Sequence, residues 1–74
     1  MYKLQHGKVK IKLDQLLKEK GISKTKFSQY AELQRTQLNR YCNNEVEMIS
    51  LDVLARMCKV LECNVSDILE YAED

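Results

Sequence analysis

Residues 23–44 read Ser23-Lys-Thr-Lys-Phe-Ser-Gln-Tyr-Ala-Glu-Leu-Gln-Arg-Thr-Gln-Leu-Asn-Arg-Tyr-Cys-Asn-Asn44. Ser23 is a typical helix N-cap, because its hydroxyl can accept a hydrogen bond from the free backbone amides of the next turn. We therefore expect a helix from Lys24 to about Ala31. The side chains expected on its inward face are Phe27, Tyr30 and Ala31.

A second short helix is expected after a tight turn through residues 32–33. It runs from Gln34 to Cys42, and the side chains expected to face inward are Leu38 and Tyr41. The pair Asn43-Asn44 ends this helix, since asparagine adopts the left-handed backbone conformation more readily than most residues. Two helices of about two turns each, joined by a tight turn, predict a helix-turn-helix over residues 23–44.

The outward positions of the second helix carry an unusual set of side chains, none of them acidic and none aliphatic: Gln34, Arg35, Thr36, Gln37, Asn39 and Arg40. These groups fit the edges of DNA bases, because arginine can grip guanine, glutamine and asparagine can pair with adenine, and a threonine methyl can touch thymine. The first turn of a recognition helix makes most base contacts. The predicted base-reading residues are therefore Gln34, Arg35, Thr36 and Asn39.

Contacts to DNA phosphates are predicted for a second set of polar and basic residues around the same motif: Lys24, Lys26, Gln37, Arg40 and Asn44. Such contacts position a protein on the duplex without reading its sequence. The competing interpretation is a polar helix face that is merely solvated.

Charge is strongly segregated along the chain, although the net charge is only +1. Residues 1–44 hold ten Lys/Arg and three Asp/Glu, which gives a net charge of +7. Residues 45–74 hold two Lys/Arg and eight Asp/Glu, which gives a net charge of −6. This split makes the first half suited to an anionic polymer such as DNA.

The rest of the chain predicts three more helices. The first runs from Leu13 to Lys20 and is closed by Gly21. Another begins after Ser50, and its apolar stripe is expected to be Leu51, Leu54, Met57, Cys58 and Leu61. The last is capped by Asn64, with Asp67 favouring its amino end, and its apolar side is expected to be Val65, Ile68 and Leu69.

The N-terminal residues 1–11 are expected to be an arm or a short strand that precedes one domain of residues 12–74. Residues 8–12 alternate basic and apolar side chains, which is a strand pattern. This segment could lead into the first helix or pair as a strand with another segment. The fold class predicted is all-α, with five helices and, as an alternative left open, a short N-terminal β-strand.

The order and spacing of several motifs resemble a known family. They are Leu16-Leu17-Lys-Glu-Lys-Gly21-Ile22-Ser23, then Phe27, Ala31, Leu33, Leu38 and Tyr41, then Ser50-Leu-Asp-Val-Leu54 and Asn64-Val-Ser-Asp-Ile-Leu69. Over about residues 12–71 the chain resembles the lambda-repressor and Cro-like helix-turn-helix regulators, also called the Xre family, in a compact single-domain bacterial or mobile-element branch. The resemblance implies a five-helix fold, binding to double-stranded DNA operators, transcription regulation as a repressor, and homodimers.

The chain departs from that family pattern at several positions. Glu32 stands where the family turn prefers glycine, Gln34 where a Ser or Thr cap is usual, and Ser28 where alanine is usual. After the second helix of the motif, Glu45 and Glu47 place two acids near a loop that would face phosphates. Either these acids weaken DNA binding by repulsion or their loop turns away from the duplex. Glu32 is expected to strain the turn or to give it a slightly different shape.

The dimer surface is left open between two candidates. One is the last helix and tail, with Leu69, Tyr71 and Ala72. The other is the segment Val9–Ile11, pairing as a strand with the partner or with the C-terminal Glu70-Tyr71.

An alternative function is a protein-interaction module, antitoxin-like or a phage adaptor, that uses the same fold without reading DNA. An enzyme is not expected, since no paired His/Cys arrangement, phosphate-cradling glycine loop or metal-ligand spacing occurs. The thiols of Cys42, Cys58 and Cys63 are expected to be small apolar core groups, without cofactor, metal or small-molecule substrate. No stretch is apolar enough to span a membrane or to resemble a signal peptide, so a cytoplasmic location is expected.

Overall fold

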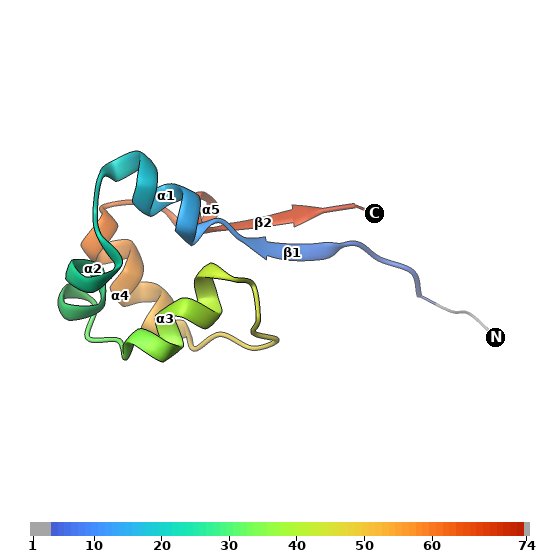
Figure 1. Ribbon diagram of the computed structural model, residues 1–74. Coiled ribbons are helices and arrows are strands. Elements are labelled where there is room, and N and C mark those ends of the chain that lie inside the picture. Colours follow the sequence, from blue (N-terminus) through green and yellow to red (C-terminus); the bar gives the residue numbers. More distant parts are fainter. Residues whose placement is uncertain (1–3, 74) are drawn as a thin grey trace.

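The computed structural model describes residues 4–73 and shows a helical body from which a two-stranded ribbon projects (Figure 1). In chain order the elements are β1 (Lys8–Ile11), α1 (Leu13–Lys20), α2 (Lys24–Tyr30), α3 (Arg35–Cys42), α4 (Leu51–Leu61), α5 (Val65–Ile68) and β2 (Leu69–Ala72). The five expected helices are confirmed, and the N-terminal strand that the sequence left open is present.

All five helices contribute to one apolar core. The side chains of Leu13, Phe27, Leu38, Met57 and Ile68 each come from a different helix, and each is 0% exposed. Burying a side chain of this size stabilises a fold by about 1.5–3 kcal/mol. The helix-turn-helix is therefore held in place by a core to which every helix is anchored.

Helix ends follow the predicted caps. The Ser23 hydroxyl accepts a hydrogen bond from the Lys26 amide at 3.2 Å, and the Ser50 hydroxyl accepts one from the Val53 amide at 3.4 Å. At the start of α5, the Asn64 amide donates to the Asp67 carboxylate at 2.9 Å as part of a capping box. Gly21 closes α1 with a left-handed backbone, φ 67°.

Three side chains predicted to face inward are exposed instead, so those predictions were wrong. Tyr30 is 63% exposed, Leu51 is 81% exposed and Val65 is 48% exposed. All three lie at the ends of their helices, because Tyr30 is the last residue of α2, and Leu51 and Val65 are the first residues of α4 and α5. Helical spacing allows each an inward position, but no other element covers the side chain.

The ribbon joins the two ends of the described chain. β1 and β2 pair antiparallel, with Val9 opposite Tyr71 and Lys10 opposite Glu70. Pairing with the C-terminal segment, one of the alternatives left open by the sequence, is therefore what occurs within the chain. Because Leu69 adopts an extended backbone (φ −113°, ψ 140°), α5 ends at Ile68, and the prediction of Leu69 as a helical residue was wrong.

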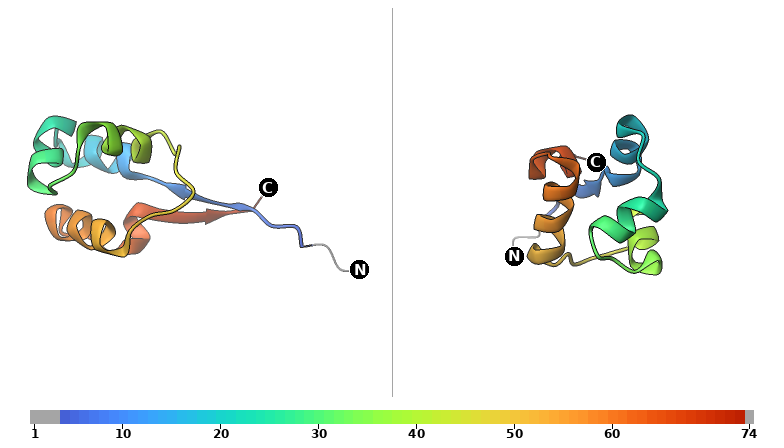
Figure 2. Two further views of the ribbon diagram at one scale, coloured as in Figure 1. Left: turned by 90° about the horizontal axis from the view of Figure 1, so that it is seen from below. Right: turned by 90° about the vertical axis from the view of Figure 1, so that its left-hand side faces the viewer.

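The ribbon extends well beyond the helices, and the molecule measures 49 × 21 × 19 Å along its principal axes (Figure 2). Near the free end of the ribbon, the two strands approach so closely that only glycine fits. Gly7 is buried, and a Cβ at this position would collide with the backbone carbonyl of Ala72. At the other end, the Lys12 amide donates to the Ile68 carbonyl at 2.6 Å, which ties the ribbon to α5.

Candidate nucleic-acid interface

The turn between α2 and α3 is sealed by apolar side chains. Ala31 is 1% exposed and Leu33 is 7% exposed, so both lie in the core beside Leu38 of α3. The Leu33 amide donates to the Ser28 carbonyl at 2.9 Å, which closes the turn on itself. This arrangement fixes the angle between the two helices and presents the outer face of α3.

Glu32 occupies the strained position that the family pattern assigns to glycine. Its φ is 56°, in the left-handed region that glycine adopts readily and glutamate does not. Arg56 of α4 stabilises this turn, because its Nη1 donates to the carbonyls of Ala31 and Glu32, both at 3.0 Å. Arg56 Nε lies 3.2 Å from Asp52 Oδ2, close enough for an ion pair but not aligned for a hydrogen bond.

Replacing Glu32 with glycine is expected to stabilise the domain. A left-handed non-glycine residue is strained by about 1–2 kcal/mol, and the extra freedom of glycine in the unfolded chain offsets part of this gain. We expect the free energy of unfolding in urea to rise by about 0.5–1 kcal/mol. The matched control is Glu32→Gln, which removes the charge but keeps the strain. A similar gain in both variants would show that charge, not the backbone, is responsible.

Arg35 is the centre of a small cluster at the start of α3. Its Nη1 donates to Thr25 Oγ1 of α2 at 2.9 Å, and its Nε donates to Asn39 Oδ1 at 3.5 Å. Arg35 and Thr25 are exposed, and Asn39 is half-buried. The structure thus brings together Arg35 and Asn39, two of the predicted base-reading residues. It adds Thr25, which was not predicted from the sequence. The other two, Gln34 and Thr36, are exposed beside them.

The second turn of α3 carries two of the predicted phosphate contacts. Gln37 is half-buried, and its amide donates to the Tyr41 hydroxyl at 3.1 Å. Arg40 is exposed, and its Nη2 donates to the Glu45 carbonyl at 3.4 Å. Arg40 therefore stands directly beside the acidic loop that the sequence analysis singled out.

The two lysines of α2 differ in whether they form an ion pair within the part of the chain that the structure describes. Lys24 Nζ lies 3.6 Å from Asp14 Oδ1, and Lys18 Nζ lies 3.2 Å from the other oxygen of the same carboxylate. These neighbours, chiefly the hydrogen bond from Lys18, hold the pKa of Asp14 below its usual range. Lys26 is exposed and forms no ion pair among residues 4–73. It is therefore the more available cation.

Asn44 has a structural partner that the sequence did not reveal. Its side-chain oxygen accepts from the Ile11 amide at 2.6 Å, and its side-chain nitrogen donates to the Ile11 carbonyl at 3.0 Å. Its left-handed φ of 58° matches the predicted end of α3. Because these bonds occupy the side chain, we assign Asn44 to anchoring β1, and it is not part of the interface proposed below.

Comparison with known proteins identifies the family to which this chain belongs. Residues 12–74 match the Cro/C1-type HTH DNA-binding domain. The chain belongs to this family. It is 34% identical over 64 residues to the "Uncharacterized HTH-type transcriptional regulator YozG" of Bacillus subtilis (strain 168), a match that covers 86% of this chain and 76% of YozG.

The fold is also similar to the crystal structure of the transcriptional regulator VanUg. The TM-score is 0.74 at 24% sequence identity, over 100% of this chain and 97% of that chain. The family resemblance and the five-helix fold predicted from the sequence are therefore confirmed. No helix of this Cro/C1-type domain within residues 4–73 is long and apolar enough to cross a membrane.

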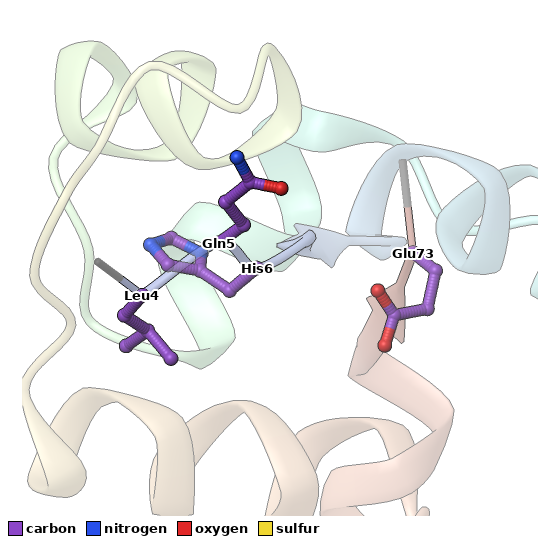
Figure 3. Close-up of a pocket in the computed structure, with 4 residues that line it drawn as sticks. All are labelled: Leu4, Gln5, His6 and Glu73. Atoms are coloured by element: carbon purple, nitrogen blue, oxygen red, sulfur yellow. The ribbon is translucent and has the colours of Figure 1, made fainter. Parts of the chain in front are cut away.

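One hollow of the Cro/C1-type domain lies away from α3, at the free end of the ribbon. It has a volume of about 590 Å³ and is lined by Leu4, Gln5, His6 and Glu73. Figure 3 shows the His6 ring and the Glu73 carboxylate on opposite sides of the view, not pointing at each other. The hollow includes no residue of the helix-turn-helix.

The cysteines of this Cro/C1-type domain match the expected core role only in part. Cys42 is buried, and burial raises the pKa of its thiol. Cys58 and Cys63 are only half-buried, and they lie together at the end of α4. Within residues 4–73, no group of three or more His, Cys, Asp or Glu side chains could hold a metal ion.

Proposed function

We propose that this domain binds double-stranded DNA sequence-specifically through the outer face of α3 and represses transcription in the cytoplasm. The observation that carries the proposal is the cluster in which Thr25 and Asn39 hold the Arg35 guanidinium at the exposed start of α3. An arginine held in this way is ready to grip a guanine edge with little further loss of side-chain freedom. Gln34, Thr36 and Asn39 are the other base-reading residues in this proposal.

Phosphate contacts are assigned to residues on both sides of this cluster. Lys26 and Lys24 come from the first turn of α2, and Gln37 and Arg40 come from α3. Lys24 gives up its contact with Asp14 when it meets a phosphate, so its net contribution is smaller than that of Lys26.

Salt dependence tests whether DNA is the partner. Because phosphate contacts release bound counterions, affinity is expected to fall steeply as salt rises, and Lys26→Ala should reduce the log–log slope by about 1 per half-site. The measurement is fluorescence anisotropy with a labelled duplex at several salt concentrations. The matched control is Lys59→Ala, on α4, which should leave the slope unchanged. A flat salt response in the unmodified protein would instead favour a protein-interaction module.

We further infer that the domain acts as a homodimer, since one such module offers few contacts and paired modules read half-sites about 34 Å apart. One face of the ribbon supports this inference. Val9 and Tyr71 lie opposite each other on that face and are 61% and 55% exposed. A two-stranded ribbon is marginally stable by itself, so a second copy covering this face would stabilise both. Sedimentation showing a monomer both free and on its operator would contradict the dimer.

A further inference from the structure

Two cysteines that are five residues apart meet at the junction of α4 and α5. Glu62 follows the last residue of α4 and has a left-handed backbone, φ 50°. The Cys63 amide then turns back and donates to the Cys58 carbonyl at 3.1 Å. This is the hydrogen-bond pattern of a Schellman motif, in which the side chains of the two bonded residues commonly touch.

This backbone bond brings Cys58 and Cys63 to the same surface of the domain, where both line one hollow. Burial raises the pKa of Cys63 most, and the neighbouring Cys58 raises it further, in part through a hydrogen bond between the two side chains. The Schellman backbone bond between Cys58 and Cys63 holds the two residues at the proximity that a disulfide needs.

The pair is also reachable from solvent. Both cysteines are half-buried and line a surface hollow of about 380 Å³, together with Lys59, Glu62, Asn64 and Asp67. A small peroxide fits in a hollow of this size. Cys42 is buried, so it is not reachable from solvent in the same way, and it belongs to α3, away from the other two cysteines in the chain.

We propose that Cys58 and Cys63 are a modification site that a hydroperoxide converts into an intramolecular disulfide. The Cys58 sulfur attacks the peroxide O–O bond, which gives a sulfenic acid and one water for hydrogen peroxide. The Cys63 sulfur then attacks the Cys58 sulfur, the S–S bond forms, and the second water leaves. Two thiols are oxidised and one peroxide is reduced to two waters. A dithiol reductant reverses the reaction.

Peptide mapping tests the proposal directly, because trypsin cuts after Arg56 and Lys59 and so separates the two cysteines. After treatment with hydrogen peroxide, the peptides 57–59 and 60–74 are expected to remain joined, with the intact mass lower by about 2 Da. Dithiothreitol should separate them. Cys63→Ser should abolish the joined pair, and Cys42→Ser should leave it intact.

The oxidised protein is also expected to melt at a higher temperature than the reduced protein, since the bond closes a short loop in the native geometry. Separate peptides after peroxide treatment would overturn the proposal, as would a link through Cys42 or between two molecules on a non-reducing gel. A lower melting temperature would overturn it too, because it would mean that the disulfide forms only when the helix cap is distorted.

Discussion

Replacing Arg35 with lysine is expected to weaken binding to the specific operator by about 5- to 150-fold, which corresponds to roughly 1–3 kcal/mol. Lysine keeps the positive charge but loses the planar fork that grips the two acceptors of guanine. Binding to unrelated duplexes is therefore expected to change little. The measurement is a titration of each variant against the operator and against a scrambled duplex at one salt concentration.

Two further variants serve as comparisons for Arg35→Lys, one at Thr25 in the Arg35 cluster and one at Arg40 on α3. Thr25→Ala removes the hydroxyl that holds the Arg35 guanidinium, so it should lower operator affinity by less than Arg35→Lys does. Arg40→Ala should weaken binding to both duplexes by a similar factor, because phosphate contacts carry no sequence information. Equal losses on operator and scrambled DNA for Arg35→Lys would contradict its role as a base reader.

Replacing Phe27 with alanine is expected to cost about 3–5 kcal/mol of folding free energy. Phe27 is 0% exposed and stands where α2 enters the core. A domain of this size is stabilised by only about 4–11 kcal/mol in total, taking 0.05–0.15 kcal/mol per residue. Much of the protein should therefore unfold at low urea concentration, which circular dichroism at 222 nm would measure.

Tyr30→Ala is the control for the Phe27 prediction, because it removes a comparable ring from the same helix. Tyr30 is 63% exposed, so its loss should change the free energy of unfolding by no more than about 0.5 kcal/mol. Equal destabilisation by the two variants would mean that Tyr30 packs in the core, as the sequence pattern alone suggested.

Local signals in the sequence predicted most of the fold. Capping residues such as Ser23 and Ser50 set the helix starts, and the spacing of Leu54, Met57 and Leu61 identified buried positions. These features depend on neighbours a few residues away. The errors at Tyr30 and Leu51 arose at helix ends, where helical spacing allows an inward position but no other element covers the side chain.

Contacts between distant residues were harder to predict. Arg56 supports the turn at Glu32 from another helix, and Thr25 holds Arg35 across ten residues of chain. One signal for Arg56 is present in the sequence, since this cation comes directly before Met57, which belongs to the predicted apolar stripe of its helix. The two hydrogen bonds between Asn44 and Ile11 join residues 33 positions apart, and no local sequence pattern predicts them.

The candidate site was predicted as a set of residue types on one helix face. The structure places Arg35 and Thr36 on the exposed first turn of α3 and Gln34, also exposed, at its N-cap. Glu32 and the loop acids Glu45 and Glu47 are exposed near this surface. Their repulsion of phosphates is expected to limit affinity more than specificity, because it acts equally on every DNA sequence.

Selection of bound duplexes from a random DNA library, followed by sequencing, tests whether the outer face of α3 reads DNA bases. If α3 reads bases, the unmodified domain should enrich a two-fold-symmetric motif whose half-sites are about one helical turn apart. The same selection with Arg35→Ala should relax the preference at one position in each half-site. A library that shows no enriched motif, or an identical motif for both proteins, would contradict the account.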